Sequence, residues 1–97
     1  MSIITKGQLK WAIMEMNRAT NSPVEPYTTQ NGKTVANVGN YHLEEAYGGY
    51  NVTRTIGQGD EIHHPFGDDF MPKRELLGRI RAFLAGIKAG RAAPASA

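Results

Sequence analysis

The chain has 97 residues, a formal net charge of +2 and no cysteine. A chain of this length has room for one hydrophobic core, so two domains are excluded. The lack of cysteine excludes disulfides and thiolate chemistry, and no apolar run approaches the roughly 20 residues of a membrane-spanning helix.

A helix start signal opens the chain. The run TKGQ fits a capping box, in which Thr5 and Gln8 each bond to the other's backbone amide. The residue before Pro23 avoids helical backbone, which ends the helix. The apolar residues between these signals follow the spacing of one helical face: Leu9, Ala12, Ile13, Met16 and Ala19. The pattern predicts a helix over residues 6–19.

The following polar segment contains Asn31-Gly32, a strong signal for a two-residue hairpin turn. It predicts two short strands, over residues 27–30 and 33–38.

A second hairpin is predicted from residues 41–47 and 50–56, which are rich in tyrosine, valine, threonine and isoleucine. Gly48 and Gly49 lie between these arms and can supply the positive φ angles of a tight turn. The first arm alternates less cleanly than the second. An alternative is a strand that stops near Leu43 and is followed by a longer loop.

The C-terminal part combines a long loop with a second helix. Residues 57–71 predict a loop of a length that is usually functional or mobile. Pro72 suits the first position of a helix, and Gly90 suits its end. The helix carries an apolar stripe formed by Leu76, Leu77, Ile80, Phe83, Leu84 and Ile87. We expect one α+β domain over residues 1–90 and a disordered tail over residues 91–97.

The expected element order is α-β-β-α, with the 27–38 hairpin as an addition. Its small antiparallel sheet would pack with one face against both helices.

The histidines are weak candidates for a metal site. His63 and His64 lie near several acids, and nitrogen and carboxylate ligands suit zinc. Adjacent residues on an extended chain point to opposite sides, however, and no histidine pair has helical spacing. No nucleophile or phosphate-loop motif is present. We expect no metal, no cofactor and no enzymatic activity, and the alternative is a small metal-dependent enzyme that uses His63, His64 and nearby acids.

Tyrosines and glycines crowd the second hairpin, and Arg74, Arg81 and Lys88 recur every seven residues on the second helix. Such a tyrosine strip suits base stacking or a protein interface, and such a row of cations can hold phosphates or an acidic partner. The alternative is structural: Tyr50 packs on the helices, Tyr47 stiffens the turn as a cross-strand partner, and the cations form a solvated face. Nucleic-acid binding is not expected, because the positive charge is modest and no motif for it is present.

The runs GNYHLEEAYGGYNVTR and KRELLGRIRAFLAGI, joined by a glycine-rich polar loop, resemble a group of small proteins encoded by tailed bacteriophages and prophages. The resemblance covers residues 9–87. It implies an accessory protein in the cytoplasm of an infected bacterial host, without implying catalytic residues.

Small phage proteins of this kind commonly act by binding. The resemblance implies counter-defence or host takeover. The clustered tyrosines, glycines and arginines favour sequestration of a small cyclic nucleotide, and the alternative is inhibition of a host defence or nucleic-acid-handling complex in the manner of anti-CRISPR proteins. We expect a homo-oligomer without membrane contact. The candidate ligand-binding residues are Tyr41, Tyr47, Gly48, Gly49, Tyr50, Arg54, Arg74 and Arg81.

Overall fold

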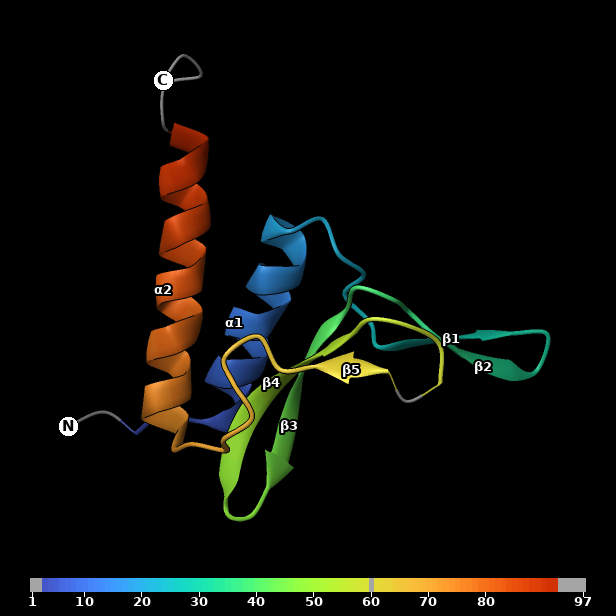
Figure 1. Cartoon of the computed structure of the whole chain (residues 1–97), viewed down its shortest axis with the longest axis horizontal. Coiled ribbons are helices and arrows are strands. Elements are labelled where there is room, and N and C mark those ends of the chain that lie inside the picture. Colours follow the sequence, from blue (N-terminus) through green and yellow to red (C-terminus); the bar gives the residue numbers. More distant parts are fainter. Residues whose placement is uncertain (1–2, 60, 93–97) are drawn as a thin grey trace.

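Two helices and two small antiparallel sheets make up the part of the chain that the computed structural model describes, residues 3–59 and 61–92 (Figure 1). The elements are α1 (Lys6–Ala19), β1 (Tyr27–Gln30), β2 (Lys33–Ala36), β3 (Tyr41–Ala46), β4 (Gly49–Thr55), β5 (Ile62–His63) and α2 (Lys73–Ala92). The predicted α+β class is confirmed.

Helix α1 has the predicted bounds and the predicted capping box. The Thr5 amide donates to Gln8 Oε1 at 2.7 Å, and the Gln8 amide donates to Thr5 Oγ1 at 3.1 Å. These bonds satisfy two of the donors that a helix start leaves unpaired.

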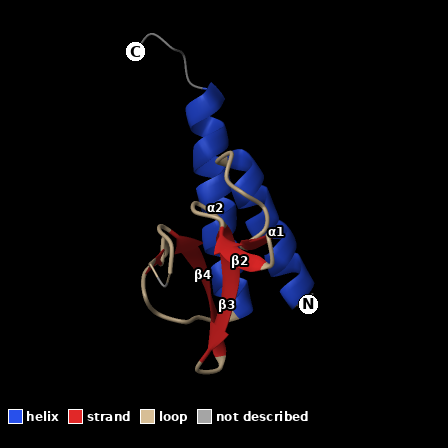
Figure 2. Cartoon of the chain, turned by 90° about the vertical axis from the view of Figure 1, so that its right-hand side faces the viewer, coloured by secondary structure: helices blue, strands red, loops and turns tan. Residues whose placement is uncertain are grey.

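Both helices cover one face of the β3-β4-β5 sheet, as Figures 1 and 2 show from two directions. The register pairs Tyr41 with Arg54 and Leu43 with Val52, so these four side chains lie on the helix side. The buried apolar core joins this face to the helices and consists of Leu9, Ile13, Met16, Tyr41, Val52, Met71, Leu76, Leu77 and Ile80.

The β3–β4 turn differs from the prediction by one residue. The turn residues are Tyr47 and Gly48, with φ of 54° and 74°, rather than the two glycines. Gly49 instead pairs with Ala46 inside the ladder. A Cβ at Gly49 would lie 3.0 Å from Phe70 Cβ and from the Met71 amide nitrogen, so the close approach of the 70–71 segment requires glycine there. The strand also continues through Ala46, so the alternative that ended it near Leu43 is wrong.

The predicted 57–71 loop contains a broken third strand beside β4. His63 pairs with Arg54, so an unbroken strand would place Gly67 opposite Tyr50. Met71 lies there instead, four residues later, and exchanges two backbone hydrogen bonds with Tyr50. The four extra residues let residues 64–70 bulge out of the sheet.

Strands β1 and β2 form a separate two-stranded sheet that projects from the body as an arm (Figure 1). All four side chains of β1 are exposed, as are the first two of β2. The prediction of this hairpin is confirmed, although β2 ends at Ala36 rather than at residue 38.

Helix α2 does not end at Gly90, because it continues through Ala92. The Arg91 side chain donates to the Ala19 carbonyl at the end of α1, which holds the last turn against the body. Residues 91 and 92 of the expected tail are therefore helical, and residues 93–97 lie outside the described residues. Neither described helix is long and apolar enough to cross a membrane.

Candidate functional site

Tyr41 and Arg54, two of the predicted ligand residues, lie together in the helix-facing layer. The Arg54 guanidinium lies over the Tyr41 ring at 4.9 Å, and Phe83 meets that ring edge-on at 6.0 Å. Tyr41 is only 6% exposed, so little of its ring is available for stacking by a ligand. This pair stabilises the core.

Tyr47 and Gly48 form the tip of the β3–β4 hairpin. Tyr47 is 96% exposed, and its ring meets Phe70 edge-on at 5.6 Å. A tyrosine with positive φ is strained, because its Cβ crowds the backbone in the left-handed region. Strained backbone positions cluster at functional sites, so the tip is a candidate for one.

Tyr50 lies next to the tip within a small charged cluster. Lys73 Nζ is 5.5 Å from the Tyr50 ring centre, and Lys6 pairs with Glu45 at 2.8 Å. The hydrogen bond from Lys6 is the main reason that the pKa of Glu45 lies below its ordinary value, and the same bond raises the pKa of Lys6. Helix α1 is tied to the hairpin through this exposed pair.

The two helix arginines lie on different parts of α2. Arg74 is exposed in the first turn, which follows directly from Met71 beside Tyr50. Arg81 lies two turns further along and lines a groove between α1 and α2 together with Trp11 and Glu15.

The eight predicted residues therefore divide among separate places. Tyr47, Gly48, Gly49 and Tyr50 are neighbours at the hairpin tip. The Tyr41–Arg54 pair lies at the opposite end of that ladder, about 14–20 Å away at 3.4 Å per residue. Arg81 belongs to the helix groove.

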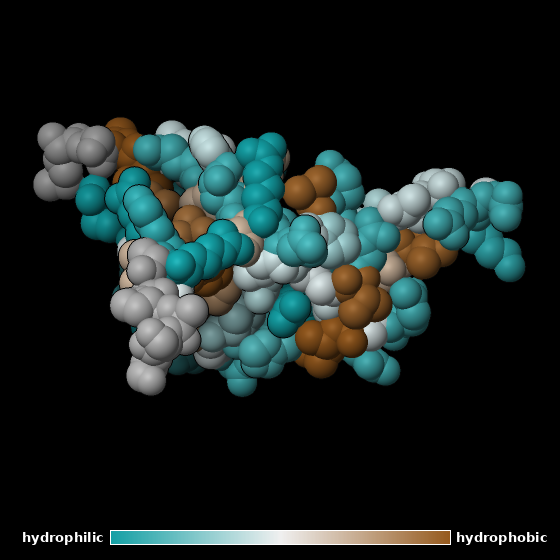
Figure 3. All heavy atoms as spheres, turned by 90° about the horizontal axis from the view of Figure 1, so that it is seen from above, coloured by the Kyte–Doolittle hydropathy of each residue, from teal (hydrophilic) through white to brown (hydrophobic). Residues whose placement is uncertain are grey.

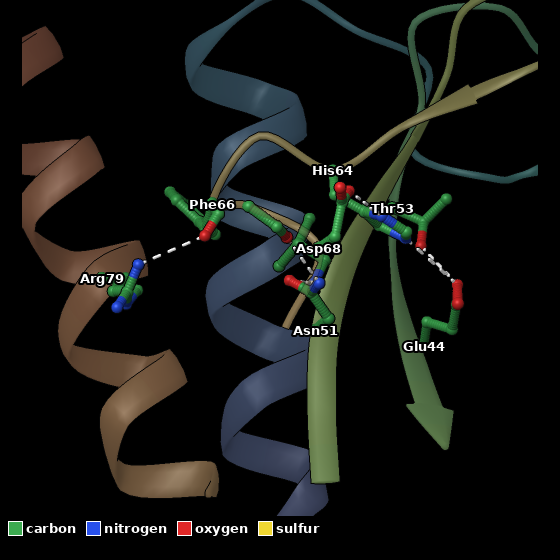
Figure 4. A network of polar contacts seen from close by, with 9 residues as sticks. Glu44, Asn51, Thr53, His64, Phe66, Asp68 and Arg79 are labelled. Carbon is green, nitrogen blue, oxygen red and sulfur yellow. Dashed lines mark hydrogen bonds and ion pairs between the residues drawn. The ribbon is translucent and has the colours of Figure 1, made fainter. Parts of the chain in front are cut away.

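His64 joins a polar network on the face of the sheet that the helices leave uncovered (Figure 4). Its Nδ1 lies 3.1 Å from Asp68 Oδ1, and its Nε2 lies 3.5 Å from Glu44 Oε2 without forming a hydrogen bond. Thr53 Oγ1 donates to the same Glu44 oxygen at 2.8 Å. Thr53 is buried, and its hydroxyl is held by this bond.

Two further bonds fix the bulge that carries His64. Asn51, which is fully buried, donates to the Gly67 carbonyl at 2.8 Å, and Arg79 donates to the Phe66 carbonyl at 3.2 Å. The network therefore holds residues 64–70 against the sheet and α2.

The weak metal candidates are not brought together. His63 is exposed on β5, whereas His64 turns toward Asp68 and Glu44. Within residues 3–59 and 61–92, no group of three or more histidine and acidic side chains is arranged to hold a metal ion.

The structure also exposes large apolar side chains that the sequence analysis did not identify as candidate binding residues. Nine large apolar side chains are exposed in the described part, as many as form the buried core. Hydrophobic side chains gather where the arm leaves the body, seen from above in Figure 3. Val38, Ile56 and Ile62 belong to the segments that meet there, which are joined by bonds from Gly39 to Thr55 and from Ile56 to Glu61. We call these three residues, together with Tyr27 on β1, the arm patch.

No protein family model, curated protein or solved structure matches this chain.

Proposed function

We propose that this chain works by stoichiometric binding of a protein partner. The proposed setting is the cytoplasm of a phage-infected bacterial cell, as its resemblance to small phage accessory proteins implies. Its role there would be counter-defence or host takeover, through inhibition of a host protein.

The exposed apolar surface carries this proposal. Exposed apolar side chains that gather on one part of a protein surface mark interaction sites. The arm patch combines the exposed aromatic Tyr27 with Val38, Ile56 and Ile62, which are each about half exposed. Aromatic and branched apolar residues are typical anchors of protein interfaces.

The shape of the arm supports the same conclusion. A two-stranded hairpin is marginally stable by itself, and this one has few buried side chains to hold it. At its base, Asn37 donates to the Glu25 carbonyl and joins the two ends of the hairpin, and Gln58 of the body donates to the Ala36 carbonyl. A partner that packs along the arm would supply the missing contacts.

A photocrosslinking experiment tests this proposal. A benzoylphenylalanine residue would replace Ile62 in the arm patch or, as the matched control, Lys88 on the exposed side of α2. After irradiation of infected cells, we expect a discrete covalent adduct from position 62 only. The same partner should be lost from purifications of the Ile62→Asp variant. Equal adducts from both positions, or none from position 62, would contradict the proposal.

Sequestration of a small cyclic nucleotide is the second candidate, and the hairpin tip supports it. Tyr47 offers an exposed ring, and Lys73 lies over the ring of its neighbour Tyr50. A stacked base with a phosphate near Lys73 would use both features.

Native mass spectrometry with a panel of cyclic and linear nucleotides tests this second candidate. A bound nucleotide that is lost in Tyr47→Ala but retained in Tyr27→Ala would support the tip as its site. A protein that stays unliganded with every nucleotide would remove this candidate and leave protein binding.

A further inference from the structure

The outer edge of β3 has backbone groups that can pair with another strand. In an antiparallel sheet, successive residues direct their N–H and C=O groups alternately to the two sides. The backbone N–H and C=O groups of Tyr50 and Arg54 are directed toward the β5 side of β4. The backbone groups of their cross-strand partners, Glu45 and Tyr41, therefore point away from β4. Leu43 lies between them on β3, two residues from each, so its backbone N–H and C=O groups also point away from β4.

Asn17 on α1 pairs with the first of these three outward positions. Its side-chain amide donates to the Tyr41 carbonyl at 2.9 Å and accepts from the Tyr41 amide at 2.7 Å. A residue of an adjacent strand would make the same two bonds, so a primary amide takes the place of a peptide group here. The edge therefore has the geometry of a strand-pairing site.

The next outward positions, Leu43 and Glu45, form no such bonds with any other segment of the described chain. A groove of about 400 Å³ lies beside Tyr41 and Leu43. One of its walls is formed by Lys10, Ile13 and Met14 of α1, and the other by residues 24–26.

We propose that this edge binds an extended segment of a partner protein, which adds to the sheet as a strand beside β3. Its backbone pairs with Leu43 and Glu45, and an apolar side chain opposite Leu43 enters the groove against Ile13 and Met14. In the added strand, the residues on either side of this apolar residue project to the opposite face of the sheet. Glu44 of β3 is one-third exposed on that face, so a basic residue is favoured there.

The charges along the edge select this occupant. The groove walls carry one lysine and one glutamate, Lys10 and Glu25, so they give no net positive field for a phosphate. A second copy of β3 is disfavoured, because symmetric pairing about Glu44 would bring two glutamates opposite each other. An alternating apolar and basic segment fits both faces.

This site is distinct from the arm patch, and the inference does not depend on the proposed function. The groove is lined by α1, β3 and residues 24–26, and no residue of the arm patch is among its lining residues. Loss of crosslinking at position 62 and loss of strand addition at β3 would therefore be separate results.

Synthetic peptides provide the probe. Peptides of roughly eight residues with alternating valine and lysine would be titrated into the ¹⁵N-labelled protein, beside the same peptides N-methylated at alternate amides. We expect the Leu43 and Glu45 amides to shift and to become protected from hydrogen exchange with the unmodified peptides. N-methylated peptides, which lack the donors for one edge, should bind about tenfold more weakly.

A proline variant isolates the backbone contribution. Glu45 is exposed and its N–H points away from β4, so Glu45→Pro removes a donor only from the free edge. Glu45→Ala keeps the donor and serves as the control, because both variants lose the ion pair with Lys6. We expect Glu45→Pro to weaken peptide binding about tenfold relative to Glu45→Ala.

The native amide spectrum of β4 would show that each variant is folded. Equal affinities of the two variants, shifts confined to other residues, or no peptide binding would overturn the proposal. Protection of Leu43 and Glu45 that grows with protein concentration alone would also overturn it, in favour of a second copy at this edge.

Discussion

Asn17 has a larger structural role than its place in a helix suggests. It is 1% exposed, and both polar atoms of its side chain bond to the backbone of Tyr41. It therefore fixes the C-terminal half of α1 to the edge of the sheet. Its loss would leave a buried N–H and C=O without partners, which is more costly than the loss of an exposed bond.

The Asn17→Ala variant should lower the free energy of unfolding by about 2–4 kcal/mol. Urea denaturation monitored by circular dichroism measures this. The neighbouring Arg18→Ala variant removes only an exposed ion pair with Glu15, so it should change the free energy by less than about 1 kcal/mol. Similar losses in the two variants would show that the Asn17 bonds contribute little.

Tyr47 occupies a turn position that its side chain does not favour. Asparagine adopts positive φ more readily, and Asn-Gly is the preferred pair for this turn. The Tyr47→Asn variant should therefore stabilise the fold by roughly 0.5–1 kcal/mol. Thermal or urea unfolding tests this, with Tyr27→Asn in extended backbone as a control that should show no gain. A destabilised Tyr47→Asn variant would indicate that the contact with Phe70 outweighs the strain.

His42 gives the fold a pH dependence. Burial lowers the pKa of His42 below its usual 6.5, although nearby Glu44 partly opposes this, and its Nδ1 lies 3.0 Å from Asn40 Oδ1. The unfolded chain then binds the proton more readily than the native one, so stability falls as the pH drops below about 6.5. The His42→Gln variant should lose part of this decline between about pH 7 and pH 5. The exposed His63→Gln variant is the control, and an unchanged slope in His42→Gln would refute the assignment.

At the scale of elements, the arm and the central hairpin differ in how they are held. Strand β4 is paired on both sides and carries buried residues on both faces. Strands β1 and β2 pair only with each other. Local stability follows buried contacts, so the arm should open without the rest of the sheet.

Hydrogen exchange should therefore be at least about tenfold faster for the β1 and β2 amides than for those of β4. Exchange measured by mass spectrometry on the free protein tests this. A partner that binds the arm patch should slow the arm amides selectively. Equal protection of β1, β2 and β4 in the free protein would contradict the view of the arm as a separately held element.

In the whole molecule, no described segment packs against the side of the helices that faces away from the sheet. A groove of about 360 Å³ lies between α1 and α2, with Trp11, half exposed, Leu77 and Leu84 in its lining. Glu15 and Arg81 flank it with opposite charges. Two copies related by a two-fold axis could place Glu15 of each against Arg81 of the other. The expected homo-oligomer remains a prediction, and this is the face on which we place it.

The Trp11→Glu variant should convert such an oligomer to a monomer, because it introduces a charge into the apolar centre of the interface. Native mass spectrometry or light scattering measures the mass. Ile3→Glu, another exposed apolar position but outside the groove, is the matched control. A wild-type monomer, or equal effects of both variants, would rule out this interface.

The sequence by itself determined the elements whose signals are local. The capping box and apolar spacing place α1 at its observed bounds, and Asn31-Gly32 places the turn of the arm. The α+β class follows from the order of these elements. Such features depend on residues within a few positions of one another, so the linear pattern contains them.

Only the tertiary structure decided the features that depend on distant residues. Phe70 and Met71 approach the backbone of β4 so closely that position 49 must be glycine. Gly49 therefore lies in the strand, and Tyr47 occupies the exposed turn. The pairing of Arg54 with Tyr41 takes both residues out of the predicted ligand strip. The bonds from Asn17 to the edge of β3 join residues 24 positions apart, and no local sequence pattern predicts them. Burial and hydrogen bonding are decided by which segments meet in space, and the order of residues along the chain specifies this only through the complete fold.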